Sequence, residues 1–216
     1  RKKKDPGKKV AKKKPARKKT GPKKTAAKNA TAKKNAQKKT ARQRPPSPIG
    51  LDLRDDGIAV LTFARPQSAA NIFDTATLDT LDSHLDEIDA MPEAKGVILT
   101  SAKESIFIAG ADLEALQKAE PEALRELVTR GQQVFQKLAD LGIPTAAAIH
   151  GVCLGGGLEV ALAWDWRVAS PDRATKLGLP ETQLGINPAW GGSTRLPRLV
   201  GLAKAIPLVT SGKTLS

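Results

Sequence analysis

Apolar and polar residues alternate along two short segments, 49–54 and 58–63. A period of two residues is typical of β-strands, and the Asp56-Gly57 pair between the segments is a strong signal for a hairpin. We therefore expect two antiparallel strands here, joined by a tight turn.

Two longer segments repeat their apolar residues every three to four positions, which is the spacing of an amphipathic helix. The first runs from 78 to 88 behind Asp74, a natural N-cap, and the second from 124 to 138 behind Pro121. A strand over 96–100 separates them. The alternation of strands and helices predicts an α/β domain with right-handed crossover connections. Four acidic residues of the first helix are expected to face water: Asp79, Asp82, Asp86 and Glu87.

A Gly-rich segment, 150–163, follows the small and uncharged residues 145–149, which are typical of a buried strand. The segment restarts as a helix that carries one carboxylate, Glu159. Glycine lets a ligand approach the main chain where a Cβ would clash, and N–H groups at a helix start point outward. The Gly156 N–H is therefore a candidate donor to a developing oxyanion. Alternatively, the turn only packs tightly and Glu159 faces solvent.

Two further stretches supply matching groups. Residues 105–113 are typical of a strand that ends in a turn, with Asp112 as the N-cap of the next helix and the Ala111 N–H as a second candidate donor. A second carboxylate, Glu181, directly follows a proline, and a Gly-rich loop occupies 187–196. The sequence thus offers two backbone donors and two glutamates.

Four segments together resemble the enoyl-CoA hydratase/isomerase (crotonase) superfamily: 109–112, 150–159, 180–181 and 191–196. The resemblance covers residues 49–216. Within it, the residues Asn71-Ile72-Phe73-Asp74 are similar to the hydratase portion of multifunctional fatty-acid oxidation proteins. The resemblance implies that ββα turns wind into a superhelix.

The resemblance also implies a role for each group. Hydration of an enoyl thioester builds negative charge on the thioester oxygen, which the N–H groups of Ala111 and Gly156 would stabilise. Glu159 would activate the water, and Glu181 would exchange the proton at the α-carbon. The implied substrate contacts are Ala109, Ala111, Asp112 and Leu113 near the thioester and pantetheine, and Gly155, Gly156, Pro180 and Leu184 near the acyl group.

Two acidic positions favour enoyl-CoA hydration, because relatives that only shift a double bond usually keep one carboxylate. Enoyl-CoA isomerisation, another acyl-CoA reaction of the superfamily, and a non-catalytic scaffold tethered to polyanions are the alternatives. The chemistry requires no metal and no redox cofactor, and coenzyme A enters as part of the substrate.

Charge divides the chain into two unlike parts. Residues 1–46 hold 21 Lys and Arg and one acidic residue, a net charge of +20, so the remaining residues carry −6 of the total +14. We expect a disordered Lys/Pro-rich tail and linker over 1–48, because this composition cannot bury enough apolar surface to fold, and one domain over 49–216. The tail resembles histone-H1-like tails and suits nonspecific binding to nucleic acid or another polyanion. A solvated linker or an unrelated leader is the alternative.

Cysteine and histidine are too few for a zinc cluster. Cys153 is the only cysteine, which excludes an internal disulfide and favours an intracellular, cytoplasmic protein. A Cys153–His150 nucleophile is disfavoured because the two side chains would lie on opposite faces of a strand. His84 is expected to be structural or solvated. The three tryptophans, at 164, 166 and 190, are expected to form packing or a pocket wall, with Trp190 the best placed to touch an acyl chain.

No apolar run approaches the about 18 residues of a membrane span. The chain ends at Ser216, shortly after a helix expected over 202–209, where the resembled family continues into a helical segment that covers the substrate and builds a trimer. The resemblance therefore implies a homotrimer or larger assembly once that segment is present.

Overall fold

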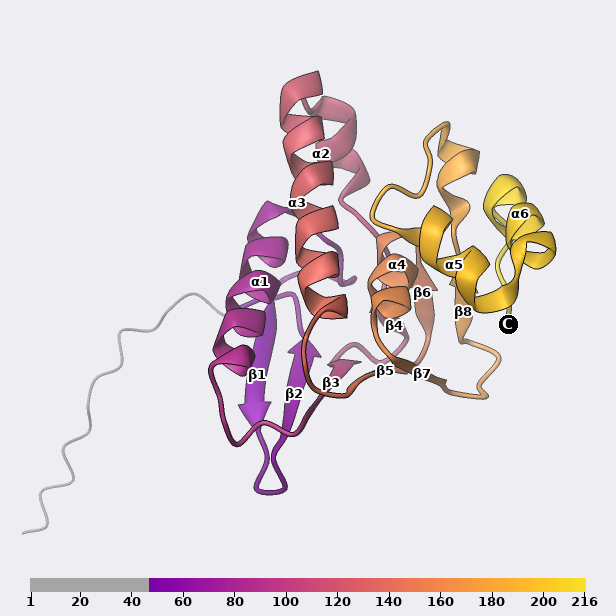
Figure 1. The fold of residues 1–216 in the computed structure, drawn as a ribbon. Helices are drawn as coiled ribbons and strands as arrows, with labels where there is room; N and C mark the ends of the chain where they lie inside the picture. Colours follow the sequence, from indigo (N-terminus) through magenta and orange to yellow (C-terminus); the bar gives the residue numbers. More distant parts are fainter. Residues whose placement is uncertain (1–46) are drawn as a thin grey trace, which may run out of the picture. The chain divides into compact units, whose positions relative to one another are not determined.

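The structure of the chain is a computed structural model that describes residues 47–216. The expected tail, its disorder and its binding to polyanions concern residues 1–46, which lie outside the described residues. In the described part, helices cover two β-sheets (Figure 1).

The larger sheet begins with the predicted hairpin. Its five strands are β1 (Ile49–Leu53), β2 (Ile58–Phe63), β3 (Gly96–Ser101), β5 (Thr145–Ile149) and β7 (Trp166–Ala169), in the order β1-β2-β3-β5-β7. β1 and β2 pair antiparallel, and every later pairing in this sheet is parallel. Gly57 closes the turn with a φ of +85°, a left-handed value that suits glycine.

The smaller sheet contains the parallel strands β4 (Ile106–Ile108), β6 (Val152–Leu154) and β8 (Lys176–Gly178), in that order. Each of them follows a strand of the larger sheet within a few residues, and a helix comes next in the chain. Repetition of this ββα turn winds the chain into the superhelix that the resemblance implies, and the right-handed sense of the crossovers stays a prediction.

The predicted helices form where their caps indicate. They are α1 (Thr75–Asp89), α2 (Leu113–Lys118), α3 (Pro121–Ala139), α4 (Gly156–Ala163), α5 (Gly192–Val200) and α6 (Leu202–Ser211), with a 3₁₀ segment η1 (Pro180–Leu184). Asp74 caps α1 by accepting a hydrogen bond from the Thr77 N–H at 2.8 Å. Asp112 caps α2 in the same way, through the Ala115 N–H at 3.0 Å.

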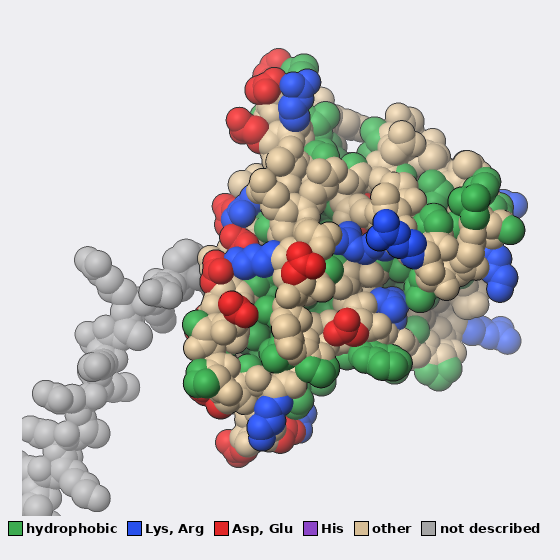
Figure 2. Space-filling model, viewed as in Figure 1, with side chains coloured by type: hydrophobic (Ala, Val, Ile, Leu, Met, Phe, Trp, Pro, Cys, Tyr) green, Lys and Arg blue, Asp and Glu red, His purple; other side chains and the backbone are tan. Residues whose placement is uncertain are grey.

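The pattern predicted that the acidic face of α1 faces water. In the structure, part of this face contacts α3 instead. Asp82 forms ion pairs with Arg130 at 2.8 Å and with Lys137 at 2.7 Å, and Lys137 also pairs with Asp86 at 2.7 Å. α3 lies beside α1 and presents these two cations one above the other, so the aspartates tie the two helices together. Asp79 adds a further contact to Arg130. Figure 2 shows acidic and basic side chains interleaved over α1 and α3.

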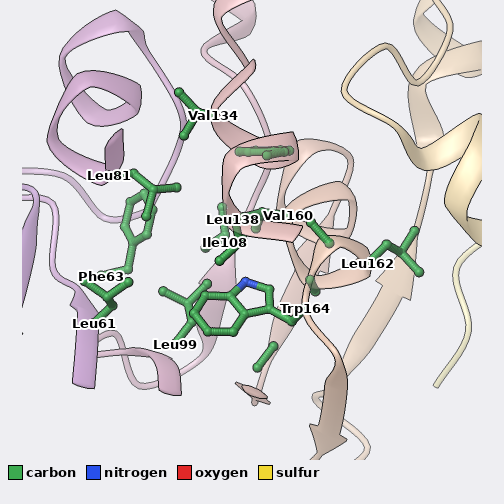
Figure 3. Close-up of a cluster of buried hydrophobic side chains, with 14 of the residues drawn as sticks. Leu61, Phe63, Leu81, Leu99, Ile108, Val134, Leu138, Val160, Leu162 and Trp164 are labelled. Carbon is green, nitrogen blue, oxygen red and sulfur yellow. The ribbon is translucent and has the colours of Figure 1, made fainter. Parts of the chain in front are cut away.

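The core lies between the larger sheet and the helices that cover it. Figure 3 shows Leu61, Phe63 and Leu99 of the sheet facing Leu81 of α1, Val134 and Leu138 of α3, and Val160 of α4. The indole of Trp164, directly after α4, closes this cluster and is 2% exposed. Trp164 therefore serves as packing, as expected.

One apolar expectation was wrong, and burial is limited to part of α3. Trp166 is neither packing nor pocket wall, because it lies on β7, the edge strand of the larger sheet, and its side chain is 68% exposed. The buried stripe of α3 begins only at Gly131, since the first half of the helix rises beyond the sheets next to α2 (Figure 1) and leaves Leu124 36% exposed. Across residues 47–216, none of the helices combines the length and apolar character needed to cross a membrane.

Candidate active site

Two backbone N–H groups meet where α4 begins. Gly155 bends the chain with a φ of +53°, and Gly156 is the first residue of α4. An ideal Cβ on Gly156 would lie 3.8 Å from the Ala111 nitrogen, and one on Gly110 would lie 3.8 Å from the Gly156 nitrogen. The two amides predicted to form the oxyanion site are therefore neighbours.

Pairing with Phe73 sets the direction of the Ala111 N–H. The Phe73 N–H donates to the Gly110 carbonyl at 2.8 Å, and the Asp112 N–H donates to the Phe73 carbonyl at 3.0 Å. Because successive N–H groups of an extended segment point to opposite sides, the Ala111 N–H points away from Phe73. Neither it nor the Gly156 N–H donates to an acceptor within residues 47–216. Both remain available to a ligand.

Glu159 lies in the first turn of α4, and its side chain is turned inward. The residue is only 3% exposed, and its Oε1 accepts hydrogen bonds from the Trp190 and Gly192 N–H groups, each at 2.8 Å. Burial, helped by the charge of Glu181, raises the pKa of Glu159 from 4.5 to about 7, although these two donors and Arg195 oppose the shift. The alternative in which Glu159 faces solvent is therefore wrong.

Glu181 lies in η1 and approaches the same place from the other side. It is 8% exposed, and its Oε2 has no hydrogen-bond partner among the described residues. Its Oε1 is 3.2 Å from the position that a Cβ on Gly155 would occupy. Burial raises the pKa of Glu181 as well. The structure thus gathers both glutamates and both amides around the glycines of the α4 turn.

The other predicted substrate contacts differ in how far they are exposed. Ala109 is half-buried and donates its N–H to the Asn71 carbonyl at 2.8 Å, while Asp112 uses its carboxylate to cap α2. Pro180 is half-buried beside Glu181. Leu113 and Leu184 lie at the surface, 46% and 54% exposed. Their predicted contacts with the substrate remain predictions.

Trp190 packs beneath the site. Its indole is 5% exposed and meets Phe73 and Phe135 edge to face, at ring distances of 5.8 and 5.6 Å. A ring carbon lies 2.7 Å from where a Cβ on Gly156 would be, and a Cβ on Gly131 would overlap the indole nitrogen. The sequence analysis did not predict this close contact between Gly131 and the indole. The available signal was Gly131 itself, a glycine in the middle of an amphipathic helix.

Asn71 is a second residue that the interpretation left without a role. It is fully buried, and its side-chain amide donates to the Phe63 and Phe107 carbonyls, each at 3.0 Å. These bonds hold the segment before α1 against β2 and β4, and Phe73 of this segment in turn pairs with Ala111. A buried amide at this place supports the site without entering it.

Cys153 and His150 do not form a nucleophilic pair. Burial raises the pKa of the fully buried Cys153 thiol far above its usual range, which disfavours the reactive thiolate. The His150 Nε2 lies 2.7 Å from the Lys103 carbonyl. His84 is also structural, since its Nε2 lies 3.0 Å from the Ile49 carbonyl.

Residues 54–216 match the family described as enoyl-CoA hydratase/isomerase. The chain belongs to this family. Among curated relatives, the fatty acid oxidation complex subunit alpha of Shewanella amazonensis is 48% identical over 164 residues, which cover 76% of this chain and 23% of the relative. The corresponding subunit of Vibrio vulnificus is 46% identical and is covered to 24%. The chain thus spans about a quarter of the length of these curated relatives.

Solved structures of family members share the fold. The enoyl-CoA hydratase of Bacillus anthracis superposes with a TM-score of 0.74 at 36% identity, with 78% of this chain and 64% of that one covered. The enoyl-CoA hydratase of Thermoplasma volcanium gives a TM-score of 0.73 at 28% identity, with 79% and 66% covered. These hydratases contain the same arrangement of two sheets and helices, which confirms the predicted crotonase-like fold.

Proposed function

We propose that this chain is the hydratase part of a fatty-acid oxidation protein and that it adds water to trans-2-enoyl-CoA to give 3-hydroxyacyl-CoA. One observation carries the proposal: two buried glutamates with raised pKa values converge on two N–H groups that have no acceptor within residues 47–216. The relatives named above, hydratases and fatty acid oxidation subunits, support the same reaction.

The thioester oxygen accepts hydrogen bonds from the N–H groups of Ala111 and Gly156. Addition of water to the β-carbon moves negative charge onto this oxygen, so the two donors stabilise the transition state more than the substrate. Gly156 contributes further because it is the first residue of α4, where the helix dipole is positive. The neutral thioester gains less from the dipole than the charged intermediate does.

The glutamates divide the proton transfers. Ionised Glu159 removes one proton from the water as its oxygen bonds to the β-carbon, and protonated Glu181 delivers a proton to the α-carbon. A pKa of about 7 makes Glu159 an effective base near neutral pH. The proton on Glu159 then returns to Glu181, so that each turnover consumes one water and restores both groups.

This chemistry needs no cofactor beyond the coenzyme A of the substrate. The family resemblance supports a homotrimer or larger assembly of the complete protein, and the single buried thiol suits a reducing compartment such as the cytoplasm. The net charge of +20 on residues 1–46 supports nonspecific binding of nucleic acid or another polyanion.

Hydration is tested with the full-length protein by following the loss of enoyl-thioester absorbance on trans-2-enoyl-CoA. We expect turnover and a 3-hydroxyacyl-CoA product. Parallel assays with 3-enoyl-CoA distinguish isomerisation. A protein that binds acyl-CoA but converts neither substrate contradicts the proposal and favours the non-catalytic scaffold.

A further inference from the structure

Arg195 connects the loop that holds Glu159 to α3. Its Nη1 donates to the Trp190 carbonyl at 3.1 Å, and its Nη2 donates to the Gln136 Oε1 at 3.1 Å. A longer bond of 3.4 Å joins Nη2 to the Phe135 carbonyl. One guanidinium therefore links Trp190, whose N–H donates to Glu159, to the C-terminal half of α3.

Gly191 lets the guanidinium lie directly on the loop. This glycine has a φ of +113°, and a Cβ on it would overlap Nη1 of Arg195. The neighbours of Gly191 on either side are Trp190 and Gly192, the two N–H donors to Glu159. Displacement of Arg195 would therefore act on both bonds at once.

Arg195 is also the cation that acts on Glu159. Charged groups reach the Glu159 carboxylate from two elements, with Glu181 on η1 opposing its ionisation and Arg195 on α5 favouring it. The strands packed against α4, which are β4 and β6, contain no charged residue. Asp140, directly after α3, and Arg198, on the next turn of α5, act on Arg195 itself.

We propose that Arg195 is a positioning residue for the reaction: it holds the Trp190 and Gly192 N–H groups on Glu159 and places its positive charge behind that carboxylate. This inference rests on the proposed function only in taking Glu159 as the base. Arg195 itself does not contact the reacting atoms. Arg195 affects the reaction indirectly, because it holds the loop that positions Glu159 and favours the ionised form of Glu159.

The test compares Arg195→Gln with Arg198→Gln in the full-length protein. Arg198 lies on the same helix and is exposed, and its side chain donates no hydrogen bond within residues 47–216, so it controls for loss of one positive charge. We expect Arg195→Gln to lower kcat by roughly 10- to 100-fold, as a displaced catalytic group does. It should also move the acidic limb of the kcat/KM profile to higher pH by at least about half a unit. Arg198→Gln should leave both unchanged.

Two further variants separate the charge from the hydrogen bonds. Arg195→Lys keeps the charge, so the acidic limb should stay in place while kcat recovers only in part. Gln136→Leu removes one anchor of the guanidinium, so kcat should fall by a few-fold with an unchanged pH profile. Gln136→Leu also keeps the inference testable if Arg195→Gln does not fold. Wild-type kcat in Gln136→Leu, or a wild-type pH profile in Arg195→Gln, would overturn it.

A titration that needs no turnover distinguishes this inference from the proposed function. The side-chain carboxyl of Glu159 is followed by ¹³C NMR against pH and assigned with Glu159→Gln. We expect the pH midpoint of the Glu159 titration to be higher in Arg195→Gln than in wild type and to be unchanged in Arg198→Gln. A wild-type protein that hydrates no enoyl-CoA contradicts the proposed function alone, whereas identical Glu159 midpoints in wild type and Arg195→Gln contradict the role of Arg195.

Discussion

The surroundings of Glu159 and Glu181 differ, although both carboxylates are buried in the same site. Glu159 accepts two backbone N–H bonds and has Arg195 nearby, whereas the Oε2 of Glu181 has no partner within residues 47–216. A carboxylate with fixed donors keeps one orientation and tolerates its charge. A carboxyl group with one buried oxygen that has no donor is more stable protonated. The comparison teaches that burial alone does not distinguish the two carboxyl groups, because their hydrogen-bond donors differ and favour Glu159 as the proposed base.

The largest loss of activity is expected for Glu159→Gln. The amide oxygen of glutamine can accept the same two N–H bonds, so the loop should stay in place while the base is lost. We expect kcat to fall about 10³-fold with little change in KM. Steady-state assays on enoyl-CoA measure this, and wild-type turnover would remove Glu159 from the mechanism.

Glu181→Gln should be somewhat less severe, with kcat reduced roughly 10²-fold. It should also make the protein more stable at pH 8, since a buried carboxylate oxygen without a donor is replaced by a neutral group of the same shape. Chemical denaturation at pH 8 measures the second effect. A destabilised Glu181→Gln protein would show that the Glu181 carboxylate has stabilising hydrogen-bond donors, and it would contradict the difference drawn here between Glu181 and Glu159.

Gly156→Ala tests the donors that lie between the two glutamates. The added methyl group would come within 2.7 Å of the Trp190 ring, so the first turn of α4 must shift. We expect kcat to fall on the order of 10²-fold. Gly142→Ala is the matched control, because a Cβ at that exposed position meets nothing within 4 Å. Equal activities of the two variants would contradict the oxyanion role.

The pH dependence of stability sharpens the comparison further. The folded state raises the pKa of Glu159 from 4.5 to about 7, so the folded protein binds this proton more tightly than the unfolded chain. The stability that Glu159 contributes is complete below pH 4.5 and is lost as the pH rises through about 7. Glu159→Gln should therefore gain up to about 3 kcal/mol relative to wild type between pH 4.5 and pH 8. Urea unfolding at both pH values measures this gain in the free energy of unfolding. An equal difference between variant and wild type at the two pH values would contradict the raised pKa of Glu159.

The smallest effect on catalysis is expected from deletion of residues 1–46, which contribute none of the groups proposed to act on the substrate. We expect kcat/KM on enoyl-CoA to stay within about twofold of wild type. Retention on duplex DNA should be lost, and in the intact protein it should weaken steeply with salt as counterions are released. Salt-insensitive retention, or a large kinetic loss on deletion, would contradict a separate electrostatic role.

Local signals predicted much of this fold. The Asp56-Gly57 hairpin, the Asp74 and Asp112 caps and the apolar stripe of α1 all depend on residues within a few positions of one another, so the sequence pattern sufficed. The segments that surround the site were found by resemblance, and the structure brings their two glutamates and two amides together.

Contacts over long sequence separations could not be predicted from the sequence. Glu159 receives its N–H bonds from residues 31 and 33 positions later, and Arg195 reaches Gln136 across 59. Trp166 was placed inside because aromatic residues usually pack, whereas only the strand order shows that β7 is an edge. In each case a second element decides the environment, and periodicity carries no information about it.

The buried position of Cys153 makes its thiol a natural probe of how often the smaller sheet opens. The chain has one thiol, which lies on the middle strand of the β4-β6-β8 sheet and is fully buried. A thiol-reactive dye can label it only when that sheet opens, so the labelling rate in native buffer counts openings of the scaffold behind Gly155 and Gly156. Rates measured with and without an acyl-CoA report how strongly a ligand holds the sheet closed, with no engineered label.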